Sequence, residues 1–170
     1  MPVLYDMYKQ RIQTKIYNPC QIVLKKLKSY MTVIKILTFG VYDFFHLGHL
    51  RLFKQCQQYA NFLIVAIQNG DYILKHKPEA KVLYSTAERK EMIGSLKIVD
   101  EVMIYDEVSP KTFKKNDFDI LALGEDHIGG RFDVVEQWCK ENGKKVVGLK
   151  RTQSICSSAI KEIIEKRKEN

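Results

Sequence analysis

The chain has 170 residues, enough for one ordinary domain, and a formal net charge of +8. No stretch approaches the roughly 18 unbroken apolar residues that span a bilayer, and the N-terminus lacks a secretory signal pattern. The sequence therefore predicts a cytoplasmic protein with no transmembrane segment. The four cysteines contain no CxxC pair, which indicates neither a disulfide framework nor a zinc site.

The positive charge is concentrated near the N-terminus. Residues 1–30 carry +5 of the +8, and residues 31–170 carry the rest. A nucleic-acid-binding domain is expected to spread basic residues over its folded face, so this partition argues against nucleic acid. The mildly basic remainder by itself suits small anionic ligands as well as it suits nucleic acid. We expect residues 1–30 to form a basic extension, flexible or loosely docked, or alternatively bound to a membrane surface or a partner. Residues 31–170 are expected to form the folded domain.

Beyond the extension, β-branched apolar runs alternate with amphipathic stretches in helical spacing. The predicted strands are 32–39, 61–67, 99–105, 119–124 and 144–149, and the predicted helices are 46–60, 85–96, 132–143 and 157–168. Asn69 and Gly70 are predicted to form the turn that ends the second strand. Strands that alternate with helices of about 10–15 residues predict right-handed βαβ units. The predicted fold class is α/β, a Rossmann-like, doubly wound, five-stranded parallel sheet with helices on both faces.

The segment FGVYDFFHLGHLRLF carries the strongest signal of a binding site. In parallel sheets ligands bind beyond the carboxyl ends of the strands, and here the first strand runs into Gly40 and His46 opens a helix. Gly48 lets backbone approach a ligand closely. His46 and His49 share one face of the helix start and can both donate to a phosphate there. A zinc pair and two structural histidines are the alternatives, but zinc needs a third ligand and none is apparent.

Two later segments also place polar groups after predicted strands. Ser157 and Ser158 precede the last helix, so their hydroxyls and the neighbouring amides form a second anion site, or alternatively a structural helix cap. Arg151 follows the fifth strand, where a bidentate phosphate contact is available. Glu125 and Asp126 follow the fourth strand. A carboxylate there accepts hydrogen bonds only, which selects the amino group of a base over a carbonyl.

Four segments, in order along the chain, resemble motifs of a known family. GVYDFFHLGH is similar to G-T-F-D-x-x-H-x-G-H, KIVDEV to R-Y-V-D-E-V, LGEDHIGGRFD to G-D-D-W-x-G-x-F-D, and RTQSICSSAIKEII to R-T-x-G-I-S-T-T-x-I. On these motifs residues 33–164 resemble the nucleotidyltransferase superfamily with the HxGH signature. Within it they resemble the cytidylyltransferase family, and most of all the glycerol-3-phosphate cytidylyltransferases.

The resemblance implies transfer of a cytidylyl group from CTP to a small phosphomonoester, with glycerol 3-phosphate favoured, giving a CDP-alcohol and pyrophosphate. It implies Mg²⁺ bound with CTP, no dedicated protein metal site, and a homodimer. The implied catalytic residues are His46, His49, Lys77 (with Lys75 as the alternative) and Arg151, and the implied acceptor contacts are Lys77, Lys111 and Asp43. The implied nucleotide-binding residues are Phe39, Gly40, Val41, Tyr42, Gly48, Arg89, Lys97, Gly124, Glu125, Asp126, Thr152, Ile155, Cys156, Ser157 and Ser158.

Several alternatives stay open at this stage. Lys111 is equally well explained as a solvated surface lysine, and Arg89 as a helix residue in a salt bridge. The chain departs from the family motifs at Val41, Lys97, His127 and Cys156, which bears on the identity of the acceptor. Another polyol, amino-alcohol or sugar phosphate, or an adenylyl transfer from ATP, is the second possibility. A non-catalytic nucleotide-binding module or a basic nucleic-acid binder is the third, and the intact histidine pair argues against an inactive module.

Overall fold

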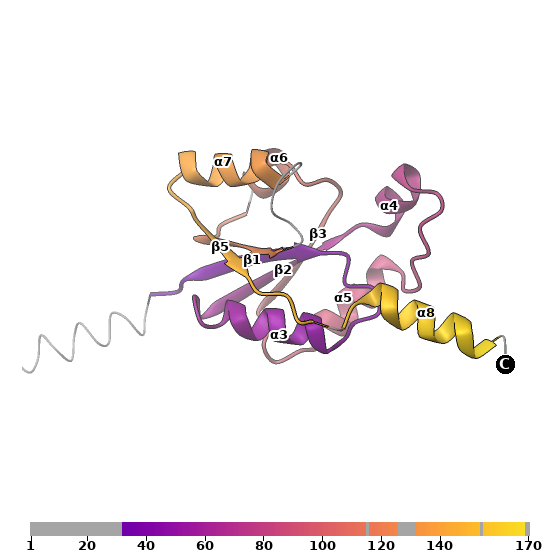
Figure 1. Cartoon of the computed structure of the whole chain (residues 1–170). Coiled ribbons are helices and arrows are strands. Elements are labelled where there is room, and N and C mark those ends of the chain that lie inside the picture. The colour runs from indigo at the N-terminus through magenta and orange to yellow at the C-terminus, as the bar shows by residue number, and fades with distance from the viewer. Residues whose placement is uncertain (1–31, 115, 126–131, 154, 169–170) are drawn as a thin grey trace, which may run out of the picture. The chain divides into compact units, whose positions relative to one another are not determined.

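The computed structural model describes residues 32–114, 116–125, 132–153 and 155–168. The predicted basic extension lies outside these residues, as do Asp126 and His127, so the division of the chain into extension and domain stays a prediction. Within the described residues, no helix is both long and apolar enough to cross a membrane. These residues fold around a single parallel β-sheet (Figure 1).

The sheet has five parallel strands in the order β3-β2-β1-β4-β5. They are β1 (Lys35–Gly40), β2 (Phe62–Gln68), β3 (Glu101–Tyr105), β4 (Ile120–Gly124) and β5 (Lys145–Leu149). The first strand, β1, lies in the middle of the sheet. Strands β2 and β3 follow on one side of it, and β4 and β5 follow on the other side. This topology confirms the predicted doubly wound, Rossmann-like sheet, and it places the reversal of strand order between β1 and β4.

Helices lie on both faces of this sheet. They are α3 (Leu47–Cys56), α4 (Gly70–His76), α5 (Thr86–Gly94), α6 (Pro110–Lys114), α7 (Asp133–Glu141) and α8 (Ser157–Lys168). Figure 1 shows α3 and α5 on one side and α6 and α7 on the other. The sequence does not predict α4 and α6. In place of the predicted turn, the Asn69 side chain accepts a hydrogen bond from the Asp71 amide at 3.1 Å and caps α4.

Alternate residues of the strands form two separate cores, because successive side chains of a strand point to opposite faces. Ile36 of β1 belongs to the core that contains Phe53 of α3 and Ile93 of α5. Leu37, the next residue, belongs to the core that contains Phe113 of α6. The sheet is thus covered on both faces, and the carboxyl ends of its strands are where it can meet a ligand.

Arg89 on α5 is completely buried and bound to backbone carbonyls. Its guanidinium donates to the carbonyl oxygens of Val41 at 2.8 Å, Gln68 at 2.7 Å and Tyr84 at 3.1 Å. These carbonyls lie just after β1, at the end of β2, and just before α5. Arg89 therefore holds the carboxyl ends of two adjacent strands against α5. The sequence predicts that Arg89 contacts the nucleotide, whereas the structure places its side chain in the interior.

We expect Arg89→Met to lower the free energy of unfolding by about 3 kcal/mol or more, because buried carbonyls would lose a charged donor. Urea denaturation followed by far-UV circular dichroism measures the change. Lys90→Met is the matched control: it removes the same charge from the neighbouring, exposed position of α5 and should change the value by less than about 0.5 kcal/mol. Equal denaturation midpoints for the two variants would contradict this structural role.

Candidate active site

A cavity of about 600 Å³ opens where the strand order reverses. Gly40 at the end of β1 and Gly124 at the end of β4 line it, together with the starts of α3 and α8 and part of the α4–α5 connection, residues 77–85. This is the crevice in which open α/β sheets bind their ligands. The sequence places the predicted site residues directly after strands, and the topology brings those strand ends together.

Most of the residues predicted to bind nucleotide or acceptor line this cavity. They are Phe39, Gly40, Val41, Tyr42, Asp43, His46, Gly48, His49, Lys77, Gly124, Glu125, Arg151, Thr152, Ile155, Cys156, Ser157 and Ser158. Lys75, the alternative to Lys77, is not among the lining residues. Asp126 lies outside the described residues.

Three predicted residues lie elsewhere. Arg89 is buried behind the loop that follows β1, as described above. Lys97 is exposed between α5 and β3. Lys111 lies on α6 and lines a second cavity, of about 580 Å³, beside Tyr105 and Glu107. Lys111 follows β3, which β2 separates from β1 in the sheet, so this lysine belongs to a different part of the carboxyl edge.

The two histidines of the HxGH segment form the N-terminal cap of α3. His46 is the N-cap, and its Nδ1 accepts a hydrogen bond from the Gly48 amide at 3.0 Å. His49 Nδ1 accepts from the His46 amide at 3.4 Å. Because Nδ1 is the acceptor in both rings, the proton of each neutral ring lies on Nε2. The rings stack with centroids 3.9 Å apart and an interplanar angle of 20°, so the two Nε2–H groups form a pair of neighbouring donors.

Both imidazoles favour the neutral form. Burial lowers the pKa of His46. Burial, and secondarily the charge of His46, lowers the pKa of His49 to about 4. Two stacked imidazolium rings would repel one another, so the uncharged state is the one that permits this stacking. At neutral pH the pair therefore offers fixed N–H donors at a helix N-terminus, where the backbone already favours an anion.

Gly48 has a packing role that the sequence does not show. A Cβ on Gly48 would lie 2.8 Å from Cε1 and 2.9 Å from Nδ1 of His46, and 3.3 Å from the carbonyl oxygen of Ile155. The glycine thus permits the close approach of the His46 ring and of the chain leading into α8. Left-handed backbone, in contrast, falls on Tyr42 (φ 55°) and Phe44 (φ 50°) in the β1–α3 loop, residues 41–46.

Another part of the cavity lining comes from the ends of β4 and β5 and the start of α8. The Arg151 amide donates to Glu125 Oε2 at 3.1 Å, which joins the segments that follow the two strands. The Ser157 hydroxyl donates to the Asp43 carbonyl oxygen at 2.9 Å, which joins the first residue of α8 to the β1–α3 loop. The first amides of α8 and the hydroxyl of Ser158 are therefore the groups at this helix start that could bind an anion.

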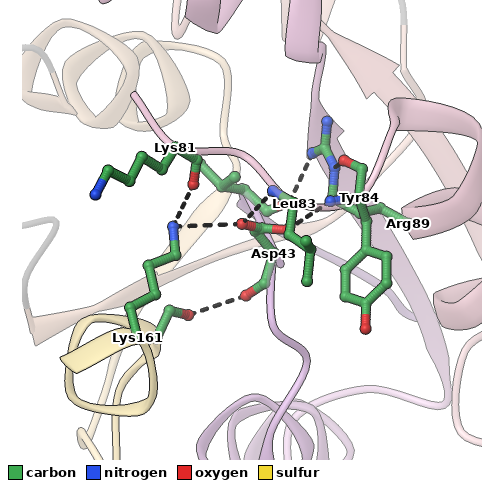
Figure 2. Close-up of polar contacts among 8 residues, drawn as sticks. Asp43, Lys81, Leu83, Tyr84, Arg89 and Lys161 are labelled. Carbon is green, nitrogen blue, oxygen red and sulfur yellow. Dashed lines mark hydrogen bonds and ion pairs between the residues drawn. The ribbon is translucent and has the colours of Figure 1, made fainter. Parts of the chain in front are cut away.

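Asp43 is the centre of a polar network that the sequence does not predict. Its buried carboxylate accepts hydrogen bonds from the amides of Leu83 and Tyr84, both at 3.1 Å. Lys161 of α8 lies 3.5 Å from Oδ2 and also donates to the carbonyl oxygen of Lys81 (Figure 2). The Asp43 carboxylate thus has protein partners, and its contact with the acceptor stays a prediction. Lys81 and Lys161 both line the cavity, and the i, i+4 spacing from Ser157 is the one sequence signal that could have identified Lys161.

Comparisons with known proteins agree with this geometry. Residues 37–163 match the family model described as cytidylyltransferase-like. The chain is 32% identical over 131 residues to a glycerol-3-phosphate cytidylyltransferase of Staphylococcus aureus, covering 75% of this chain and 92% of that protein. It is also 31% identical over 140 residues to an FAD synthase of Methanohalophilus mahii, covering 79% of this chain and 96% of that protein.

A solved structure supports the fold independently. The lipopolysaccharide core biosynthesis protein from Thermoplasma volcanium superposes with a TM-score of 0.59 at 21% identity, covering 73% of this chain and all of that chain. The family match spans the sheet except for the first two residues of β1, and it covers the HxGH segment and most of α8. It includes every described residue that lines the cavity. On the family model and the relatives together, this chain belongs to the cytidylyltransferase-like family.

Proposed function

We propose that this protein transfers a cytidylyl group from CTP to a small phosphomonoester, with glycerol 3-phosphate as the favoured acceptor. The observation that carries the proposal is the stacked, neutral pair His46 and His49 at the start of α3, in one cavity with Arg151 and the start of α8. This arrangement presents donors to a triphosphate from several sides. The similarity to a glycerol-3-phosphate cytidylyltransferase supports the choice of nucleotide and acceptor.

In the proposed reaction an oxygen of the acceptor phosphate attacks the α-phosphorus of CTP. A bond forms between that oxygen and the α-phosphorus, the bridging bond to the β-phosphate breaks, and pyrophosphate leaves with the electron pair. A phosphomonoester has a second pKa of about 6, so at neutral pH the acceptor is mostly a dianion and needs little help from a general base. Catalysis then consists of alignment and stabilisation of charge on the phosphates.

The residues of the cavity supply that stabilisation. The Nε2–H groups of His46 and His49 donate to phosphate oxygens of the nucleotide, and Arg151, which lines the same cavity, adds a charged donor. Lys77, at the C-terminal end of α4, contributes a cation on the side of the α4–α5 connection. Because the histidines are fixed by their Nδ1 bonds, these donors need no reorganisation as charge develops.

When bound with CTP, Mg²⁺ would supply positive charge that neutralises the phosphates. Among the described residues, no group of three or more histidine, cysteine or acidic side chains is arranged to hold a metal ion. The Asp43 oxygens accept backbone amides, and Glu125 accepts the Arg151 amide. The residues of the cavity therefore fit a Mg²⁺ held mainly by phosphate oxygens and water.

An adenylyl transfer from ATP is the second candidate, favoured by the similarity to an FAD synthase. Glu125 accepts hydrogen bonds from an amino group, which both cytosine and adenine carry. This carboxylate therefore supports either nucleotide, and a direct assay separates the two.

The test is pyrophosphate release with CTP or ATP, each combined with a panel of phosphorylated alcohols and flavin mononucleotide. We expect release to require CTP and to be fastest with glycerol 3-phosphate. Release with ATP and flavin mononucleotide alone would replace the proposal with the second candidate. Release with CTP and a different phosphorylated alcohol would keep the cytidylyl transfer and change the acceptor.

His49→Ala should lower kcat by about a hundred- to a thousandfold, because it removes a fixed transition-state donor. His76→Ala is the control, since His76 lies on α4 and does not line the cavity. Its kcat should stay within about twofold of the wild-type value, as for a surface change away from the site. Thermal unfolding checks that both variants are folded. Wild-type turnover in a folded His49→Ala protein would remove the central element of the mechanism.

CTP should slow the alkylation of Cys156, which lines the cavity beside Ser157. Cys56 and Cys139 are buried, and burial raises the pKa of their thiols to about 12 and about 11. In a Cys20→Ser background, which removes the cysteine of residues 1–30, modification by iodoacetamide therefore reports on Cys156. Mass spectrometry over time measures the rate. Equal rates with and without CTP would place the nucleotide away from the start of α8.

A further inference from the structure

We infer that Lys161 of α8 is a positioning residue for the proposed reaction, acting through Asp43. It joins three segments that build the cavity: α8, the β1–α3 loop and the α4–α5 connection. The catalytic consequence of this inference rests on the proposed function. The joint itself, which we define as the contacts of Lys161 with Asp43 and with the Lys81 carbonyl, can be tested without substrate.

The Lys161 ammonium group has contacts in two segments besides its own helix. Its Nζ lies 3.5 Å from Asp43 Oδ2 and 5.1 Å from the centroid of the Phe44 ring, both in the β1–α3 loop. The same Nζ donates to the Lys81 carbonyl oxygen in the α4–α5 connection, as Figure 2 shows. A single cation thus binds a carboxylate and an aromatic face of the β1–α3 loop together with a carbonyl of a second segment that is distant in the sequence.

The environment of this ion pair separates it from an ordinary surface pair. The Asp43 side chain is 6% exposed and that of Lys161 is 30% exposed. On the same helix, Lys166 and Glu162 are closer, at 2.7 Å, but their side chains are 70% and 65% exposed. Water screens the exposed pair, so it contributes little. Loss of Lys161 would instead remove a cation that lies against a buried carboxylate, which is costly.

Asp43 connects this lysine to the reacting groups. It lies three residues before the N-cap His46, and its own carbonyl accepts the Ser157 hydroxyl. Its carboxylate holds the amides of Leu83 and Tyr84. Lys161 and Ser157, one helical turn apart, therefore attach α8 to Asp43 at two points. This attachment sets the start of α8 and the segment after Lys77 relative to the histidines.

Kinetics of three variants test the catalytic consequence. Lys161→Met should lower kcat/KM about a hundredfold, mainly through kcat, because misplaced reacting groups lose alignment in the transition state. Lys161→Arg retains the cation and should recover at least about tenfold of that loss. Lys166→Met removes the same charge from the exposed pair and should stay within about twofold of wild type. Equal values for Lys161→Met and Lys166→Met would overturn the inference.

A double-mutant cycle with Asp43→Asn separates positioning from direct contact with a ligand. If Lys161 acts through Asp43, the double variant should lose no more activity than the more impaired single variant. Losses that multiply would mean that Lys161 acts on the substrate independently of Asp43, and would overturn the inference. Urea denaturation of each variant ensures that only folded proteins are compared.

Limited trypsin digestion tests the joint without any substrate. Lys161 binds the carbonyl of Lys81, which is the carbonyl that trypsin attacks at the Lys81–Val82 bond. Lys161→Met should be cut at this bond at least about tenfold faster than wild type, because local opening becomes easier. Lys166→Met should be cut at the wild-type rate, and mass spectrometry identifies the bond. Equal rates for the two variants would overturn the inference. Absence of pyrophosphate release by the wild type would instead overturn the proposed function.

Discussion

The buried carboxylate of Asp43 is the constraint on which the arrangement of the site depends. A charge in the interior must find donors, and here the donors come from two distant parts of the chain: the amides of Leu83 and Tyr84 and the ammonium group of Lys161. The backbone of the same residue accepts the Ser157 hydroxyl, 114 residues along the chain. One acidic residue of the β1–α3 loop therefore holds the α4–α5 connection and α8 beside the cavity.

The histidine pair shows how the same loop supports chemistry as well as structure. The Nδ1 atoms of His46 and His49 are used to cap α3, and this fixes the rings and leaves both Nε2–H groups as donors. Burial keeps both rings neutral by lowering their pKa values. Oriented donors in a partly desolvated site stabilise developing charge more effectively than solvated cations would. This electrostatic arrangement suits phosphoryl chemistry, in which the protein supplies alignment and charge stabilisation.

The interior of the molecule fixes the positions of the histidine pair and Asp43. The two cores cover both faces of the sheet and leave the carboxyl ends of β1 and β4 facing the cavity. Arg89 ties the carbonyls after β1 and at the end of β2 to α5, so the loop that contains Asp43 and His46 starts from a fixed point. Gly48 completes the arrangement by letting the His46 ring and the Ile155 backbone approach. The packing of Arg89 and Gly48 thereby fixes the geometry of the groups that line the cavity.

Local patterns in the sequence were sufficient for the alternation of strands and helices and for the helix that His46 opens, since both depend on neighbouring residues. They also identify most of the lining residues, because these follow strands directly. Local sequence patterns could not predict the contacts of the long cationic side chains. The Arg89 side chain is buried, Lys111 lines the second cavity, and Lys161, which the sequence does not predict, lines the candidate active site. What a lysine or arginine contacts depends on the segments packed within its reach, and only the tertiary structure decides which distant carbonyls and carboxylates those are.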